Sequence, residues 1–369
     1  MVMTQVFTTS NLVRISTFFQ NAGVSITFVF MPIIAKNMSQ SFFEIGLIIA
    51  AFSLAQILSA MFFGRVSDKK GNRLFFIQAG FVASSIVFAL HYLADDSLML
   101  FLARISAGIA TGIMIPAMLA YSYESSTEKT KIASIISFQA LGWLAGIIAA
   151  GISNDEKIIF LVSAGFFALG FLFSLRLPKI SSEKLVGKGL TKQVIVKNKT
   201  LFFSLLLRHT GATAVWAILP IVLIEKMGAH LYEVSIVYIA NTLTSFVIMT
   251  MMGTRLKINN VTKFKIGLGL TIFVFIGLAV VKEWWMTFPF MALVGLSWAF
   301  LYIGGNVYLM ENNPKSTSTG IFSSTLSIAS VIGPLVAGAI ASYFGFVSVM
   351  YFAGAISFSA FLISLAIKK

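Results

Sequence analysis

Cysteine is absent from this chain, and charged residues are scarce. None of its 369 residues is a cysteine, which excludes disulfides, thiolate nucleophiles and cysteine-bound metals. Charged residues make up 11% of the chain, against about 25% in soluble domains. Hydrophobic residues make up 58%, and the mean hydropathy is +0.92. Such a chain cannot keep its surface in water, so most of that surface must contact lipid or other buried helices.

The motifs of soluble enzymes are also missing. The sequence contains no G-x-S-x-G, no H-E-x-x-H and no phosphate-binding loop. Its three histidines, His91, His209 and His230, show no metal-ligand spacing. His91 and His230 fall near the outer ends of apolar runs, where we expect them to be solvated, whereas His209 falls within a run. We therefore expect a protein that is not an enzyme and that holds no metal and no cofactor.

What the sequence does contain is a series of long apolar runs. They are too long and too weakly alternating for barrel strands, so they predict an all-α membrane protein with twelve transmembrane helices. The first run is longer than a signal-peptide core and lacks a cleavage pattern, so we interpret it as a span. The expected spans are 12–35, 42–63, 74–94, 97–122, 132–152, 157–177, 201–224, 233–253, 265–282, 286–310, 319–343 and 346–367.

The net charge of +14 follows from where the basic residues lie. If the even-numbered loops and both termini are cytoplasmic, few basic residues remain on the outer side, as the positive-inside rule requires. The outer basic residues are then Lys36, Lys157, Lys226 and Lys282. We therefore expect a multi-pass protein of the cell membrane with cytoplasmic termini. The basic surplus is therefore topological, with some contact to anionic lipid expected in addition, and it does not indicate nucleic-acid binding.

One polar stretch divides the chain. Residues 178–200 carry six lysines and one glutamate, which predicts a cytoplasmic linker. The predicted domains are an N-terminal six-helix bundle at 1–177 and a C-terminal six-helix bundle at 201–369.

The two halves repeat. Alignment at an offset of 187 to 189 residues matches small and charged residues in order, with one-residue drifts of the kind that loop insertions produce. Six helices followed by six related helices are typical of transporters that alternate access to a central site. The aligned pairs include Gly23 with Gly211, Pro32 with Pro220, Glu44 with Glu233, Gly64 with Gly253 and Glu124 with Glu311.

The segment GRVSDKKGNR at 64–73 lies between the second and third expected spans. It resembles the loop signature G-x-x-x-D-(R/K)-x-G-(R/K)-(R/K) of the major facilitator superfamily, and only Asn72 departs from it. The resemblance extends over the whole chain through helix number, linker and repeat, and it implies the major facilitator fold of two pseudo-symmetric bundles. The matching residues are Gly64, Asp68, Lys69, Gly71 and Arg73.

The resemblance implies that this loop is a conformational latch on the cytoplasmic side. The residues fit such a role, because Asp68 is able to hydrogen-bond to basic neighbours and Gly71 permits a turn closed to other residues. The alternative is an ordinary charged loop that obeys the positive-inside rule. In the second half Gly253 persists but Lys257 replaces the aspartate, so any latch there is expected to be degenerate.

Spans 4 and 5 carry further family patterns. Arg104, Gly108 and Gly112 resemble the arginine and glycine signature of span 4, and we group Arg104 and Gly108 with the latch. A buried arginine in a membrane is normally functional or paired, although Arg104 could also extend to the outer interface. Span 5 at 142–151 resembles the pattern G-x-x-x-G-P-x-x-G-G of exporting members but lacks its proline. Plain small-residue packing is the alternative there.

Polar residues recur at matched depth in spans 1 and 7, which line the pathway in this family. Asn21 lies about 13 Å from Leu12 and His209 about 12 Å from Leu201, so both approach the midplane of a core about 30 Å thick. A polar contact between helices without a ligand is the alternative. The aligned pairs are Gln20 with Arg208, Asn21 with His209, Ser25 with Thr213 and Phe28 with Trp216.

Several other polar residues fall within spans and complete the predicted substrate-binding set. They are Gln56, Gln139, Asn241, Tyr302 and Asn306. No carboxylate falls deep in an expected span, so the usual proton carrier of proton-coupled members is missing. His209 could titrate instead, or coupling could involve Asp68 and Arg104, or be absent.

Together these features predict a secondary active transporter for a small molecule. The resemblance is greatest to the drug:proton antiporter branch, which implies an exporter of small amphipathic compounds, with protons as the candidate coupling ion and a monomeric protein. Uptake of a small polar solute or organic anion is the main alternative, because Arg104, Arg208 and His209 suit an anion. A membrane receptor or enzyme is a further alternative, but no sensor domain or nucleophile constellation supports it.

Overall fold

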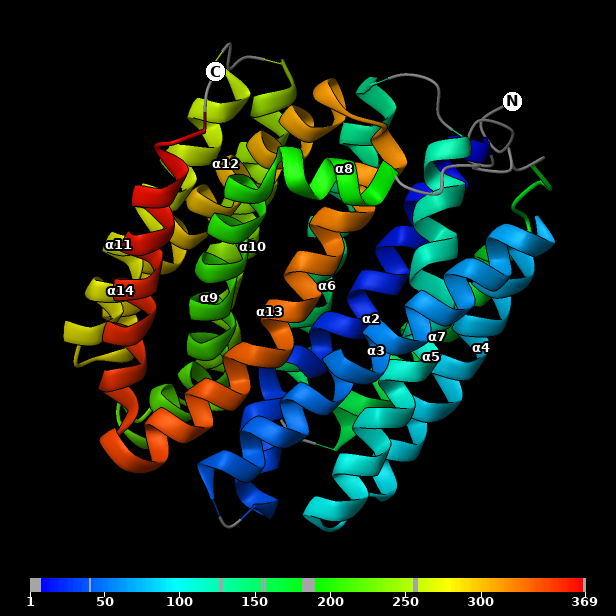
Figure 1. Cartoon of the computed structure of the whole chain (residues 1–369). Coiled ribbons are helices and arrows are strands. Elements are labelled where there is room, and N and C mark those ends of the chain that lie inside the picture. The colour runs from blue at the N-terminus through cyan, green and yellow to red at the C-terminus, as the bar shows by residue number, and fades with distance from the viewer. Residues whose placement is uncertain are drawn as a thin grey trace. The chain divides into compact units, whose positions relative to one another are not determined.

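A computed structural model describes residues 8–39, 41–125, 129–153, 155, 157–180, 190–254 and 258–367. The terminal residues 1–7 and 368–369, residues 181–189 of the predicted linker and Lys257 lie outside the described residues. The first-half helices are α2 (Thr9–Met38), α3 (Phe42–Lys70), α4 (Arg73–Leu90), α5 (Ser97–Glu124), α6 (Lys129–Ile152) and α7 (Ile158–Ser174), with the short η1 (His91–Leu93) (Figure 1). The later helices are α8 (Leu190–Lys197), α9 (Lys199–Glu225), α10 (Leu231–Thr254), α11 (Asn260–Val280), α12 (Phe288–Asn312), α13 (Lys315–Phe344) and α14 (Phe346–Ser364), with the short η2 (Trp284–Thr287).

These helices confirm the all-α membrane architecture. Ten described helices are long and apolar enough to cross a membrane, and two shorter apolar segments, Ser137–Ile152 and Ile158–Ser174, complete the expected series. Two details differ from the sequence-based expectation. The second span continues as helix to Lys70, and the linker contains the helix α8. Apolar periodicity did not predict these parts because both are polar helix with few buried residues.

The described chain forms two compact units. Unit 1 comprises residues 1–31 and 51–186, and unit 2 comprises 32–50 and 187–369. The segment 32–50, which joins the first two spans, therefore belongs to the same unit as the second-half helices. Within unit 2 the ring of Phe42 meets that of Phe346 edge-on at 4.9 Å, and Lys36 Nζ lies 3.6 Å from Glu225 Oε1.

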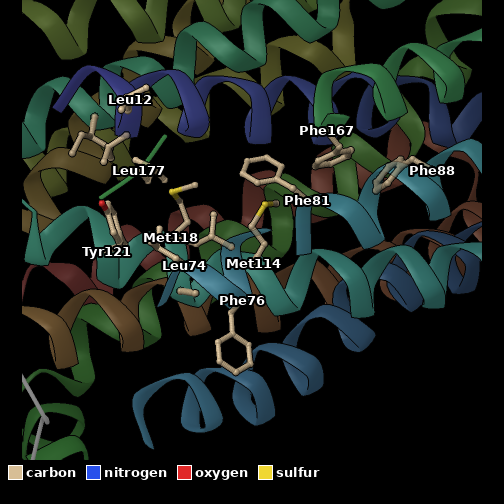
Figure 2. Packing of buried hydrophobic residues seen from close by; sticks show 14 of the residues in the cluster. Leu12, Leu74, Phe76, Phe81, Phe88, Met114, Met118, Tyr121, Phe167 and Leu177 are labelled. Carbon is tan, nitrogen blue, oxygen red and sulfur yellow. The ribbon is translucent and has the colours of Figure 1, made fainter. Parts of the chain in front are cut away.

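The core of unit 1 is built from aromatic and long aliphatic side chains (Figure 2). Phe81 on α4 and Phe167 on α7 are fully buried, and Met114 of α5 lies in the same cluster. Burial of this kind fixes α4, α5 and α7 against one another, because a change in the volume of one side chain in a close-packed interior forces the neighbouring side chains to shift. Unit 2 has an equivalent core around Phe264, Leu301 and Phe322.

A hydroxyl and a glycine hold the same pair of helices together in each unit. In unit 1, Ser25 Oγ on α2 lies 3.3 Å from the carbonyl oxygen of Trp143 on α6, and a Cβ at Gly146 would overlap it. In unit 2, Thr213 Oγ1 on α9 donates to the carbonyl oxygen of Ala329 on α13 at 2.9 Å, and a Cβ at Gly333 would overlap it. The repeat read from the sequence therefore appears as a repeated packing contact.

Candidate functional site

An aromatic and amide cluster lies half-way along α2 in unit 1. Trp143 Nε1 on α6 donates to Asn21 Oδ1 at 3.1 Å, and the ring of Phe28 meets the ring of Trp143 edge-on at 5.1 Å. Asn21 Nδ2 in turn donates to the carbonyl oxygen of Thr17 at 2.8 Å, so the amide is held in one orientation. Asn21, Phe28 and Trp143 are each only partly buried, so this rigid group keeps an accessible face.

Other predicted residues of unit 1 lie apart from this cluster or are occupied by packing. Ser25 is fully buried and bonded to backbone, as described above, so its part in substrate binding stays a prediction. Gln56 on α3 donates to Thr111 Oγ1 on α5 at 3.1 Å. Gln20 is buried with its Oε1 unpartnered among the described residues, and Gln139 on α6 is partly buried.

A cationic and aromatic cluster lies around α9 in unit 2. Arg208 on α9 is 2% exposed; its Nε donates to Thr271 Oγ1 at 3.1 Å, and Nη2 lies 3.4 Å from Ser297 Oγ. The guanidinium lies 5.6 Å from the ring centroid of Trp298, and the ring of His209 stacks on the same indole at 5.5 Å. His209 Nδ1 is buried without a partner in the described part of the chain.

The remaining predicted residues of unit 2 surround this cluster or pack elsewhere. Tyr302 lies 5.1 Å from the ring of Trp298, and Asn306 Nδ2 donates to the Tyr302 carbonyl oxygen at 3.2 Å. Trp216 packs instead against Tyr238 and Phe275, with ring centroids 6.1 and 6.3 Å away. Thr213 is bonded to backbone at 5% exposure, and Asn241 on α10 accepts from Ser245.

The 64–73 segment forms an ion-pair network at one end of unit 1. Arg73 pairs with Asp68 and lies 3.1 Å from Glu124 Oε1, and its Nη1 donates to Ser67 Oγ at 3.2 Å. The expected hydrogen bond between Asp68 and a basic neighbour is thus confirmed. The expectation of a loop was wrong in extent, because Asp68 lies within α3 and the turn between the helices is short. That turn is built on Gly71, whose φ of 63° confirms the predicted conformation.

The other residues of the predicted latch have differing surroundings. Gly64 lies within α3, where a Cβ would be 3.4 Å from Pro116, and Lys69 is exposed. Arg104 is 3% exposed, with its guanidinium 4.2 Å from the ring centroid of Phe52. Its Nε and Nη1 are buried without hydrogen-bond partners among the described residues. Gly108 lies one turn further along α5, and a Cβ added there would be 2.3 Å from the carbonyl oxygen of Phe52.

His91 differs from the expectation of a solvated side chain. It is 0% exposed. Its ring stacks on the ring of Phe88 at 5.3 Å and lies 5.0 Å from the ring of Phe160. Its Nδ1 is 2.9 Å from the carbonyl oxygen of Val87. The prediction failed because a span end was equated with the water boundary, whereas the rings of Phe88 and Phe160 cover His91. His230 is exposed, as expected.

The Major Facilitator Superfamily model matches residues 14–319 and again residues 201–368. The chain belongs to the Major Facilitator Superfamily. It is therefore a multi-pass membrane transporter, and the predicted fold of two six-helix halves is confirmed. The second match begins where the second half begins, in agreement with the repeat.

Curated relatives of this family member are named for drug resistance. It is 24% identical to the multidrug resistance protein MdtG of Proteus mirabilis (strain HI4320), over 92% of this chain and 91% of the relative. It is 21% identical to the quinolone resistance protein NorA of Staphylococcus aureus (strain COL), over 86% of each chain. The predicted resemblance to efflux members is thereby confirmed at the level of sequence similarity.

Solved structures share the fold at lower identity. The crystal structure of the nucleoside transporter NupG superposes with a TM-score of 0.75 at 15% identity, covering 98% of this chain and 100% of the other. The human organic anion transporter MFSD10 (TETRAN) superposes with a TM-score of 0.75 at 16% identity, covering 96% and 98%. At such identities the likeness concerns the fold alone.

Sequence reasoning missed the two indoles that organise the clusters, Trp143 and Trp298. A signal was present, because the chain has five tryptophans and only Trp284 and Trp285 of these lie at a span end. A tryptophan in the middle of a span places a hydrogen-bond donor away from the interface, and such a donor normally finds a partner.

Proposed function

We propose that this transporter exports small aromatic, amphipathic compounds that are neutral or negatively charged. The observation that carries the proposal is the indole of Trp298 with Arg208, His209 and Tyr302 around it. An aromatic face beside fixed polar groups suits a flat, partly apolar ligand, because such sites combine apolar walls with a few placed polar groups. The names of the curated relatives MdtG and NorA support export.

The absence of a deep acidic group supports the charge preference. In the described part of the chain, carboxylates lie in loops or within the first or last turn of a helix, as Glu44, Asp68 and Glu311 illustrate. Arg208 is bonded to two hydroxyls rather than to an acidic residue. An uncompensated cation favours a negative or neutral ligand nearby. In unit 1 the Asn21, Trp143 and Phe28 cluster is a second candidate contact for an aromatic substrate.

Uptake of an organic anion is the alternative, and the same basic residues favour it. Purified protein in liposomes separates the two directions if an aromatic dye and a labelled aromatic acid are each loaded inside or supplied outside, under an imposed proton gradient. Export predicts dye movement toward the acidic compartment. If only the labelled acid moved, and in the same direction as the protons, the result would favour uptake of an organic anion over export.

A pair of tryptophan variants tests the site. Trp298→Ala should raise the substrate KM at least about tenfold, since an aromatic contact and its buried area are lost together. Trp285→Ala is the matched control, because that indole is 54% exposed at a span end and should leave transport unchanged. Equal effects of the two substitutions would remove the cluster from substrate binding.

We propose protons as the coupling ion, with His209 as the carrier to test first. Flux through His209→Gln should lose its dependence on the imposed proton gradient, because glutamine cannot carry a proton. His230→Gln is the control, because this histidine is exposed and stacks only on Tyr232 among the described aromatic rings. An unchanged dependence on the gradient in His209→Gln would remove His209 as the carrier and leave Asp68 and Arg104 for the same test.

We also propose that α8 and the 64–73 segment are cytoplasmic, as the positive-inside rule favours. The chain has no native cysteine, so a single cysteine reports its own accessibility. A cysteine at Lys192 should resist an impermeant thiol reagent in intact cells, and one at Asp95 should react. The reverse pattern would invert the orientation.

The protein is proposed to be a monomer. Purified protein is expected to have the mass of a monomer in light scattering.

A further inference from the structure

A cavity of about 520 Å³ opens within unit 2, beside the helix α8. It is separate from the Trp298 cluster, since no residue of that cluster lines it. Its volume falls in the range of small-molecule sites, roughly 300–1,000 Å³. The lining residues, from α8, α9, α13 and α14, are Ile195, Lys199, Thr200, Phe202, Phe203, Leu206, Thr325, Ile328 and Ile363.

The walls of this cavity are apolar and face outward. Ile195, Phe203 and Ile328 are 42%, 50% and 44% exposed. Lys199 is the first residue of α9, and Leu206 lies seven residues further, about 10 Å along the helix. The cavity therefore extends from a helix end, where a lipid headgroup would lie, into the depth of the hydrocarbon.

The start of α9 at this cavity carries the exposed Lys199. Its first turn contains no acidic residue, and no side-chain cap is present among the described residues. Asn198, at the cap position, instead donates to the Val194 carbonyl oxygen at 2.9 Å and lies 3.4 Å from Asn313 Oδ1. A lysine at the membrane end of a helix, with no acidic residue in the first turn, favours a phosphate nearby.

The helix α8 beside the cavity suits the membrane surface. α8 carries exposed Ile195 and Val196 together with exposed Lys192, a composition suited to the membrane surface. The negative end of α14 is already occupied, because Lys265 Nζ donates to the carbonyl oxygens of Leu365 and Ile367 at 3.3 and 3.0 Å. Figure 1 shows α8 running across α9 and α13.

We infer that this cavity binds an anionic phospholipid of the cytoplasmic leaflet, with one acyl chain along Phe203 and Leu206 and the phosphate at Lys199, at the start of α9. Basic residues at the membrane surface attract such lipids. The site is independent of the transported substrate, and it would tie the linker helix α8 to the end of α9.

The test is retention of lipid by the purified full chain. The protein is extracted from nanodiscs of equal phosphatidylglycerol and phosphatidylcholine, and bound lipid is counted by native mass spectrometry. Phosphatidylglycerol should be retained preferentially. Lys199→Gln should lower its retention about fivefold, and Leu206→Trp, which fills the cavity, at least about tenfold.

Matched variants separate this site from lipid that merely surrounds the protein. Lys192→Gln removes a lysine that does not line the cavity, and Leu362→Trp enlarges a side chain that is 49% exposed on α14; both should retain phosphatidylglycerol within about twofold. Equal retention of the two lipids, or equal losses in cavity and control variants, would overturn the inference. Displacement of phosphatidylglycerol by a transported aromatic dye would also overturn it, because the cavity would then be a substrate site.

Glycerol phosphate distinguishes the headgroup from the whole lipid. Because the acyl chain is part of the site, this soluble headgroup should neither displace phosphatidylglycerol nor raise the Tm of the wild-type protein, whereas added phosphatidylglycerol should raise the Tm. A Tm rise with glycerol phosphate alone, lost in Lys199→Gln, would reduce the site to a phosphate site and overturn the lipid assignment. Size-exclusion profiles check that each variant is folded.

Discussion

The two halves keep the same packing residues but differ in where they bury positive charge. Ser25 and Thr213 make the same hydroxyl contact to a neighbouring span. In contrast, the repeat equivalent of Arg104 is the fully buried Met291, and the equivalent of Arg208 is Gln20. After duplication, the contacts between helices were constrained by close packing, whereas the polar positions were free to diverge.

The two halves also differ in charge where the helix that follows the second span of each half begins. In unit 1, Arg73 begins α4 and pairs with Glu124 at the end of α5. In unit 2, Asn260 begins α11 and its Nδ2 donates to Glu311 Oε2 at 3.0 Å, near the end of α12. Both pairs join residues 51 apart, so the second half retains the geometry but replaces an ion pair by a neutral hydrogen bond.

The largest expected effect comes from breaking the shared packing. Gly146→Ala and Gly333→Ala should each destabilise the folded protein by about 1–3 kcal/mol, because the added methyl overlaps a hydroxyl and a backbone carbonyl. Gly165→Ala and Gly320→Ala are controls with nothing within 4 Å of the added methyl. Thermal unfolding in detergent measures the difference. A stable Gly333→Ala beside an unstable Gly146→Ala would show that the two contacts are not equivalent.

The next effect concerns the ion pair between Arg73 and Asp68, which has no equivalent among the described residues of unit 2. Asp68→Asn should fold normally and lower transport at least about tenfold, roughly 1.4 kcal/mol, because Arg73 loses a charged partner. Lys70→Gln, a change at an exposed neighbour outside the predicted latch, should leave flux within about twofold. Flux in liposomes at equal protein content is the measurement. Wild-type flux in Asp68→Asn would mean that the segment is only a topology signal.

Replacing Arg104 by the second-half residue should separate function from stability. Arg104→Met removes a buried cation whose Nε and Nη1 have no partner in the described structure, so the Tm should rise. Transport should fall about fivefold, because a costly intramembrane charge is normally functional. Unfolding temperature and flux are measured on one preparation. A lower Tm with unchanged flux would assign Arg104 to structure alone.

The sequence was sufficient for most of the fold and for part of the site. Span positions followed from apolar run length, and the Asp68 hydrogen bond and the Gly71 turn followed from the chemistry of those residues. The pairings Asn21 with Trp143 and His209 with Trp298 could not be predicted, because each joins helices that do not follow one another along the chain. Repeat symmetry also predicted that Phe28 and Trp216 would be equivalent, but Phe28 packs on α6 and Trp216 on α10 and α11.

The smallest expected effect compares the two glutamates at equivalent helix ends. Glu124→Gln removes the charge from a pair with the 4% exposed Arg73, whereas Glu311→Gln alters a hydrogen bond to the neutral amide of Asn260 at an exposed position. A partly buried charge pair is worth more than an exposed neutral contact, which solvent replaces easily. Flux should therefore fall about threefold in Glu124→Gln and less than about twofold in Glu311→Gln.

The converse substitution strengthens this comparison. Asn260→Arg introduces a cation beside Glu311 and reproduces the Arg73 to Glu124 pair, since both pairs have the same spacing. The Tm should rise slightly, and the added stability should disappear in the double variant Asn260→Arg with Glu311→Gln, because only the charge pair accounts for it. Lys263, 7% exposed and also near Glu311, remains in all of these variants and is a constant background. If Glu311→Gln lowered flux as much as Glu124→Gln does, the second half would hold a latch as strong as the first, and the difference between the halves would lie in the buried arginines alone.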